Sequence, residues 1–132
     1  MDALRNAALI AARVLMAGVF IYDSTLLARF PASNMDYMAA FGLPGILLWP
    51  TALFQFGGGL LLVAGLLTRL VAVAFAGFAV ATAVIFHTGF ADINDINHFG
   101  KDLALAGGFL CLAVTGAGAW SADAALAGRR RG

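Results

Sequence analysis

Two apolar runs decide the fold: ILLWPTALFQFGGGLLLVAGL (residues 46–66) and RLVAVAFAGFAVATAVIFHTG (residues 69–89). Each is about as long as the ~20 apolar residues that an α-helix needs to cross a bilayer. Only Leu67 and Thr68 separate the two runs, so a tight turn joins the helices. Because a connection this short makes consecutive helices antiparallel neighbours, the two runs predict a transmembrane helical hairpin.

A further apolar run lies on each side of this hairpin. Before it, AALIAARVLMAGVFIYDSTLLA covers residues 7–28, and after it, FGKDLALAGGFLCLAVTGAG covers residues 99–118. The four runs predict an all-α fold, an integral membrane four-helix bundle, formed by a single domain of residues 1–132. Residues 29–45 link the first two spans, and residues 119–132 form a basic tail.

The composition favours a bilayer over water as the surrounding medium. Of the 132 residues, 62% are hydrophobic and 11% are charged, and glutamate is absent. Soluble domains carry about 25% charged residues, and so short a chain buries too little surface to hide this many apolar side chains. We therefore expect the lipid bilayer as a partner. The net charge of +1 gives no reason to expect nucleic acid.

The loop charges predict how the bundle is oriented. With four spans, both termini lie on one side of the membrane, and that side carries most of the arginines. It holds Arg5, Arg69, Arg129, Arg130 and Arg131, whereas the other side holds Asp36, Asp92 and Asp95 with Arg29 and Lys101. Because basic residues collect on the cytoplasmic face, both termini and the basic tail are expected in the cytoplasm.

Titratable side chains gather around FHTGFADINDINHFGKD (residues 86–102). Position along each helix converts to depth in the membrane at 1.5 Å per residue. By this measure, one layer near the outer end of the bundle contains Asp23, His87, His98, Lys101 and Asp102. Gln55 lies below this layer, near the middle of its span. Arg13 stands apart, roughly 9 Å inside the cytoplasmic end of the first span, and needs a lipid phosphate, a carbonyl or a ligand as partner. Charges inside a membrane normally face the bundle interior, so these residues form the candidate site.

Three interpretations of the outer layer stay open. In the first, it is a structural knot in which Lys101 pairs with Asp23 or Asp102. In the second, it is a ligand or proton site in which His87 titrates near neutral pH. In the third, His87 and His98 bind zinc, iron or copper with an aspartate such as Asp95, although the spacing matches no closed metal motif.

Small residues recur at helical spacing. They are Ala72/Ala76, Ala79/Ala83 and Ala104/Gly108, with Gly57, Gly58 and Gly59 in the middle of a span. Because such residues let helix backbones approach closely in lipid, we expect them to pack this bundle. The alternative is a face for a second copy of the chain or for another membrane subunit.

The order of four motifs indicates a family. Arg13 opens RVLMAGVF in the first span, FQFGGGLLLVAGLLTRL covers the second span and its turn, His87 lies in FHTG, and the chain closes on GAGAWSAD (residues 116–123). Over nearly its whole length the chain resembles the DoxX family of small four-helix bacterial membrane proteins. The resemblance implies a multi-pass protein of the bacterial inner membrane. The chain departs from the family pattern at Gln55, where many members carry a glutamate. Because a glutamine cannot shuttle a proton, Asp23 would have to replace that glutamate in any proton transfer.

The resemblance also implies a function, because similar proteins include quinone-reducing subunits and membrane partners of oxidoreductases. We expect a small subunit of a quinone-linked electron-transfer system; the alternative is a non-enzymatic scaffold or assembly subunit of a larger membrane complex. Whether the chain is itself an enzyme is left open. No motif for haem, flavin or an iron–sulfur cluster is present, so a quinone is the expected cofactor. Its polar contacts would be His87, Gln55 and Asp23, and its aromatic walls would be Phe20, Tyr22, Phe54 and Phe86.

Overall fold

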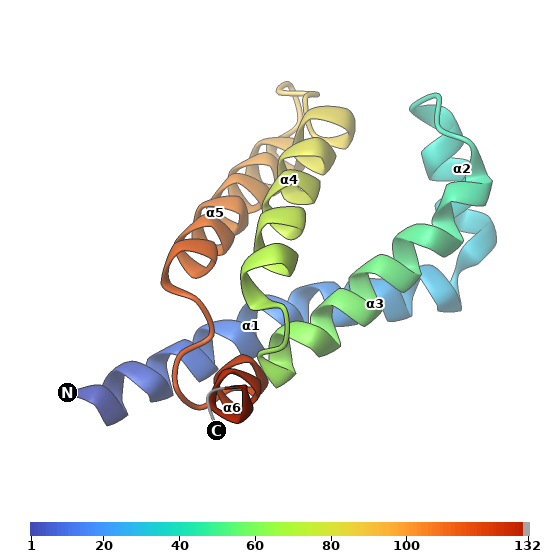
Figure 1. The fold of residues 1–132 in the computed structure, drawn as a ribbon. Helices are drawn as coiled ribbons and strands as arrows, with labels where there is room; N and C mark the ends of the chain where they lie inside the picture. Colours follow the sequence, from blue (N-terminus) through green and yellow to red (C-terminus); the bar gives the residue numbers. More distant parts are fainter. Residues whose placement is uncertain (131–132) are drawn as a thin grey trace.

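Long helices make up most of the computed structural model, which describes residues 1–130 (Figure 1). The four long ones are α1 (Asp2–Arg29), α3 (Leu48–Ala64), α4 (Thr68–Phe86) and α5 (Ile93–Thr115). The short ones are α2 (Pro31–Ala40), the 3-10 helix η1 (Gly45–Leu47) and α6 (Ala122–Arg129). No strand occurs anywhere in residues 1–130, so the predicted all-α class is confirmed.

The predicted hairpin between α3 and α4 is also confirmed. The α3 helix ends on Gly65, whose φ of +70° is a left-handed conformation that glycine adopts without strain. Its N–H donates to the carbonyl of Leu62, and the N–H of Leu66 donates to Leu61 at 2.9 Å. Leu67 also has a positive φ, +50°, and α4 starts at the next residue. Two left-handed residues therefore reverse the chain within one short turn.

The long helices form two pairs, α1 with α3 and α4 with α5, which diverge from each other in Figure 1. Where the pairs cross, three aromatic rings from α1, α4 and α5 form the core. The Phe20 ring stacks on Phe75 at a centroid distance of 4.5 Å and lies 5.5 Å from Phe109. Alanines fill the space around them: Ala17, Ala72, Ala76, Ala79 and Ala106. Beyond this crossing the pairs separate, and side chains at their divergent end face a shared space.

The glycine run in α3 has two close neighbours. A Cβ atom on Gly59 would lie 2.5 Å from the Ile21 side chain and 3.4 Å from the Ala17 carbonyl oxygen. A Cβ on Gly58 would lie 2.7 Å from the Phe75 ring, whereas Gly57 has no heavy atom within 4 Å. The predicted packing role is thus confirmed for Gly58 and Gly59, which let α1 and α4 approach α3.

Among the described residues, three helical segments are long and apolar enough to cross a membrane: Asp2–Arg29, Gly45–Ala64 and Thr68–Phe86. The fourth predicted span, α5, does not meet the same test, because its first half carries several polar side chains. It also begins at Ile93, so the expected start near residue 99 was wrong. The side chain of Asp92 accepts a hydrogen bond from the Asn94 N–H at 2.8 Å, and this cap extends the helix into the polar segment.

The linker 29–45 contains α2. Pro31 stands in the first turn of this helix, where its missing N–H costs no hydrogen bond. One aromatic residue of α2, Tyr37, stacks on Phe86 of α4 at 5.5 Å between centroids and an interplanar angle of 22°. The linker therefore places a helix against the divergent end of the bundle.

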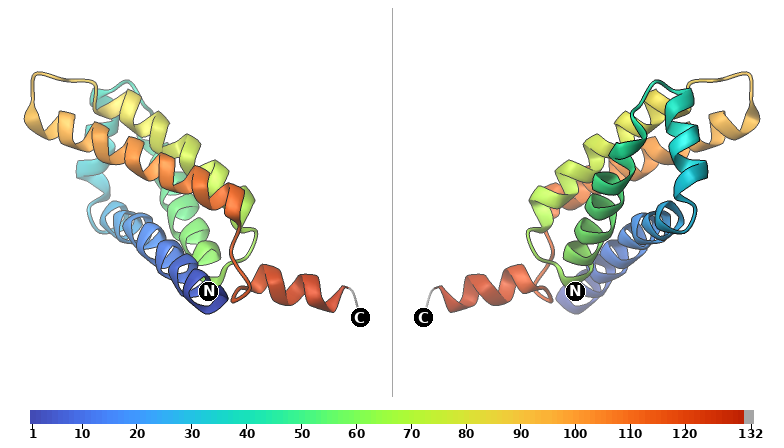
Figure 2. Two further views of the ribbon diagram at one scale, coloured as in Figure 1. Left: turned by 90° about the vertical axis from the view of Figure 1, so that its left-hand side faces the viewer. Right: turned by 90° about the vertical axis from the view of Figure 1, so that its right-hand side faces the viewer.

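At the opposite end, α5 stops at Thr115, three residues before the predicted boundary, and Gly116 turns the chain with a φ of +78°. The Ala119 N–H donates to Asn6 Oδ1 at 3.1 Å, so both ends of the chain lie at one end of the bundle. Ser121 caps α6 by accepting from the Ala124 N–H, and α6 projects away from the bundle (Figure 2). In the predicted basic tail, Arg131 and Gly132 lie outside the described residues.

Candidate functional site

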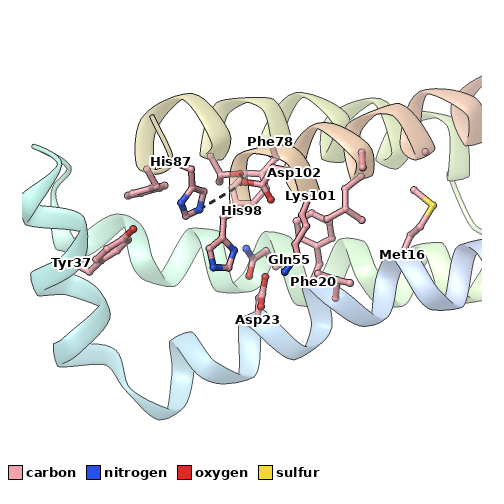
Figure 3. Close-up of a pocket in the computed structure, with 16 residues that line it drawn as sticks. Met16, Phe20, Asp23, Tyr37, Gln55, Phe78, His87, His98, Lys101 and Asp102 are labelled. Atoms are coloured by element: carbon pink, nitrogen blue, oxygen red, sulfur yellow. Dashed lines mark hydrogen bonds and ion pairs between the residues drawn. The ribbon is translucent and has the colours of Figure 1, made fainter. Parts of the chain in front are cut away.

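A cavity of about 760 Å³ lies between the two helix pairs at the divergent end of the bundle (Figure 3). We call it the inter-pair cavity. Five helices contribute side chains to its lining. They include Phe20 and Asp23 of α1, Tyr37 of α2, Gln55 of α3, Phe78 and Thr82 of α4, and His98, Lys101 and Asp102 of α5. Each helix pair thus forms one wall, and α2 lies at one end.

All six residues of the predicted ligand or proton site line this cavity: Asp23, Gln55, His87, His98, Lys101 and Asp102. They come from four segments that are far apart in the sequence. In Figure 3, Asp23 and Gln55 lie on the α1/α3 side, and His87, His98 and Asp102 lie on the α4/α5 side. The structure therefore brings these residues together, and what they do there stays a prediction.

His87 lies between two carboxylates of α5. Its Nδ1 atom is 3.5 Å from Asp95 Oδ1, and its Nε2 atom is 4.0 Å from Asp102 Oδ2. The Asp102 carboxylate also accepts a hydrogen bond from the Thr82 hydroxyl at 3.2 Å. The ring of His98 stacks against His87, with centroids 5.0 Å apart. Both imidazoles thus lie on the α4/α5 wall, and the two nitrogens of His87 each face a carboxylate.

On the opposite wall, the polar side chains have fewer hydrogen-bond partners. Gln55 is 6% exposed, and within residues 1–130 its Oε1 atom has no hydrogen-bond donor. Leaving a buried polar group unpaired costs about 1–3 kcal/mol, so such a group normally has a partner. Asp23 likewise forms no ion pair or side-chain hydrogen bond with any described residue, and Lys101 pairs with neither Asp23 nor Asp102 within 4.0 Å. The ion pairs that the structural-knot interpretation predicted for Lys101 were therefore wrong, whereas a purely structural role of the layer stays a prediction.

The aromatic lining differs in part from the predicted one. Phe20 and Phe86 line the cavity as expected, and Phe78, which was not expected, joins them. Tyr22 is 63% exposed and points away from the bundle. Phe54 packs into the core against Phe75 and Phe78, at centroid distances of 5.0 and 5.3 Å. The expectation that Tyr22 and Phe54 form walls was wrong, because the sequence gives no sufficient information on how a largely apolar helix is rotated.

The metal interpretation gains no support from the geometry. In the described part of the chain, no three histidine, cysteine or acidic side chains come close enough to hold a metal ion. His87, His98 and Asp95 lie near one another, but His87 and His98 stack face to face. Parallel stacked rings do not direct two nitrogens at one point, as a tetrahedral site requires.

The comparisons with known proteins agree with this architecture. The model of the DoxX family matches residues 8–88, which include α1 to α4 and His87. This chain belongs to the DoxX family. It is similar to inner membrane protein YqjF of Escherichia coli (strain K12), with 41% identity over 96% of this chain and 97% of the relative. It is also similar to inner membrane protein YphA of the same organism, with 34% identity over 92% of this chain and 91% of that protein. No solved structure gives a significant match.

Together with its membrane-spanning helices, these relatives show that this DoxX chain is a multi-pass protein of the inner membrane. The family match ends before α5. Of the six predicted site residues, His98, Lys101 and Asp102 therefore lie outside the matched DoxX region, whereas Asp23, Gln55 and His87 lie inside it. The α1/α3 wall and His87 belong to the part of the chain that defines the family.

Arg13 of this DoxX chain does not line the cavity and makes different contacts. Its side chain is 2% exposed, and its Nη2 atom donates to the Trp120 carbonyl oxygen at 2.9 Å. A carbonyl was one of its predicted partners, and that prediction is confirmed. Arg13 also lies directly against Gly65, where a side chain would collide with the guanidinium.

The residue that sequence reasoning missed is Asp123. Its carboxylate accepts hydrogen bonds from the Leu67 N–H at 2.8 Å and the Thr68 N–H at 3.0 Å, and thereby caps the first turn of α4. The Asp123 N–H in turn donates to the Gly65 carbonyl at 2.9 Å. We call Arg13, Gly65, Trp120, Ser121 and Asp123 the C-terminal clamp. The DoxX-like ending GAGAWSAD was the signal that could have pointed to it.

Acid should loosen the C-terminal clamp. Burial alone would raise the pKa of Asp123, but the hydrogen bonds from Thr68 and Leu67 and the charge of Arg13 outweigh it and hold that pKa below its usual value. A lowered folded-state pKa means that the ionised carboxylate stabilises the fold above the unfolded pKa of about 3.9 and that this contribution is lost as pH falls below it. Thermal unfolding in detergent should therefore show a steeper loss of stability below about pH 4 for the wild type than for Asp123→Asn. If thermal stability fell equally steeply with pH in the wild type and in Asp123→Asn, Asp123 would not be ionised in the clamp.

Proposed function

We propose that this chain is a small inner-membrane subunit of a quinone-linked electron-transfer system, and that the inter-pair cavity holds the quinone head group. The observation that supports this most is the buried, unpaired Oε1 atom of Gln55 on one wall, opposite the histidines of the other wall. This oxygen could accept a hydrogen bond from a hydroxyl group of the reduced quinone. Ligand sites of this size are mostly apolar, with a few polar groups that fix orientation.

The two walls fit the shape of a planar ring with a carbonyl at each end. Gln55 and Asp23 offer polar atoms from the α1/α3 pair, while His87 and Lys101 offer N–H groups from the α4/α5 pair (Figure 3). Between them, the rings of Phe20, Phe78 and Phe86 supply flat apolar surface. A bound quinone would supply the electron-carrying chemistry, and these residues would orient its head group and hold protons near its oxygens.

The position of the cavity also fits a proton-coupled ligand. By the predicted orientation, the divergent end of the bundle faces away from the cytoplasm. Asp95 reaches His87 from the first turn of α5, and its side chain is 31% exposed. A proton on His87 would thus lie between a partly exposed carboxylate, Asp95, and one that lines the cavity, Asp102.

Purification tests the proposal directly. Wild-type protein extracted from membranes in mild detergent should retain quinone, measured by solvent extraction and chromatography. Gln55→Leu and His87→Ala should each reduce the retained quinone about tenfold or more, since each removes a buried polar contact worth about 1–3 kcal/mol. Tyr22→Ala is the control, because Tyr22 points away from the bundle and its loss should leave the quinone content unchanged.

Other outcomes would contradict the proposal. Wild-type protein that carries no quinone and does not take it up on addition would remove the electron-transfer role. If a stoichiometric membrane partner then failed to assemble without this chain, and Gln55→Leu and His87→Ala still supported assembly, the chain would be a scaffold subunit instead.

A further inference from the structure

The inter-pair cavity reaches the surface of the bundle between α1 and α5. Its lining there consists of Met16 and Val19 from α1 and of Ala104 and Gly108 from α5. Val19 is 41% exposed, and Ala104 is also exposed. Because these residues belong both to the cavity and to the outer surface, the cavity continues to the side of the bundle that a bilayer would surround.

The end of the cavity near α2 is different, because aromatic rings cover it. Tyr37 stacks on Phe86, and Phe41 packs edge-on against the same ring at 5.1 Å. In Figure 3, Tyr37 and Met16 lie at opposite ends of the cavity. The polar residues lie between these ends, and two of them, His98 and Lys101, are themselves exposed. Toward Met16, by contrast, the lining is apolar.

Two adjacent glycines of α5 show how narrow the lateral opening is. A Cβ atom on Gly108 would lie 3.0 Å from the terminal methyl carbon of Met16, across the opening. A Cβ on Gly107 would have no heavy atom within 4 Å, because this residue points away from the bundle. The missing side chain of Gly108 thus leaves just enough room for the flexible end of Met16, which borders the opening on the α1 side.

We infer that the inter-pair cavity opens sideways into the bilayer between α1 and α5, and that its ligand is an amphiphile whose apolar tail leaves through this opening. The tail would lie along Met16, Ala104 and Gly108, and the polar head would meet the buried, unpaired Oε1 atom of Gln55. The identity of the head group rests on the proposed function. The lateral opening and the need for an apolar tail are inferred from the cavity lining and do not rest on the proposed function.

Binding of a tailed probe tests the inference. Decylubiquinone and the same benzoquinone head group without a tail are titrated into full-length protein in lipid nanodiscs. Gly108→Leu should weaken decylubiquinone binding about tenfold or more, because its side chain fills the space next to Met16. It should change binding of the tail-less head group much less. Gly107→Leu is the matched control and should bind both probes like the wild type. Equal effects of the two substitutions on decylubiquinone would overturn the inference.

A second measurement separates this inference from the proposed function and does not depend on how well Gly108→Leu folds. A phospholipid with a photoactivatable acyl chain should label Phe78, which lines the cavity on α4, in the wild type, and the label should be lost in folded Gly108→Leu protein. If Phe78 is labelled but decylubiquinone does not bind, the quinone assignment fails and the lateral opening stands. If Phe78 is not labelled in the wild type, the opening does not exist.

Discussion

Gly65→Ala should destabilise the protein more than any other single-methyl addition in the chain. The new Cβ would overlap the guanidinium of Arg13 and lie 2.6 Å from Ser121 Cβ. Arg13 would have to leave its buried position and its hydrogen bond to Trp120, at a cost of about 2–3 kcal/mol. A left-handed alanine adds about 1–2 kcal/mol. We expect the free energy of unfolding, measured by SDS titration in mixed micelles, to fall by about 3–5 kcal/mol.

Gly42→Ala is the matched control. Gly42 has a similar positive φ, +76°, but no heavy atom lies within 4 Å of the added Cβ. This substitution should therefore show the backbone cost alone, about 1–2 kcal/mol. If both substitutions lower stability equally, the C-terminal clamp contributes nothing beyond the conformation of its turn.

Gly59→Leu should separate α1 from α3. Gly59 is buried where these helices meet, and even a single carbon there would press on Ile21 and approach the Ala17 backbone. Overpacking a well-packed contact costs about 1–3 kcal/mol, and here the backbone of α1 limits how far the site can relax. We expect the free energy of unfolding to fall by about 3 kcal/mol. Quinone retention should also fall, because α1 carries Asp23 and α3 carries Gln55.

Gly57→Leu provides the comparison within the same helix. Gly57 has open space around its Cα, and leucine favours helix over glycine by up to about 1 kcal/mol. This variant should be as stable as the wild type or slightly more stable. An equal loss of stability in Gly57→Leu and Gly59→Leu would show that α1 does not approach α3 at Gly59.

The spans could be predicted because apolar runs of membrane length are a strong signal that needs no tertiary information. The start of α5 could not be placed in the same way. Asp92 caps that helix, so its first turns consist of polar residues, and a boundary taken from hydrophobicity falls too late. Capping residues in the segment 92–98 were the available local signal.

Depth along a helix could also be predicted, whereas rotation about its axis could not. A fixed rise per residue placed Asp23, His87 and Asp102 at one level, and all three line the cavity. Tyr22 and Phe54 were assigned to the wrong surroundings, because in a largely apolar helix every side could face either lipid or protein. Only the packing against neighbouring helices decides between them.

The C-terminal clamp was beyond local reasoning for a further reason. Asp123 caps a helix that begins 55 residues earlier, at Thr68, and no spacing rule connects two such positions. The cause is tertiary: the segment after α5 returns to the α3–α4 turn, where the N–H groups of Leu67 and Thr68 at the start of α4 need an acceptor.

The most direct test of the central claim is a solid-state NMR measurement in lipid bilayers with a quinone carrying ¹³C in its head group. Gln55 is the only glutamine of the chain and His87 is one of two histidines, so selective ¹⁵N labelling, with His98 replaced, gives one amide and one imidazole to observe. Magnetisation transfer from the head group to both Gln55 and His87 is the predicted result, since it places the ring between the two helix pairs. Transfer to neither residue, with the quinone present in the same bilayer, would contradict the proposed site.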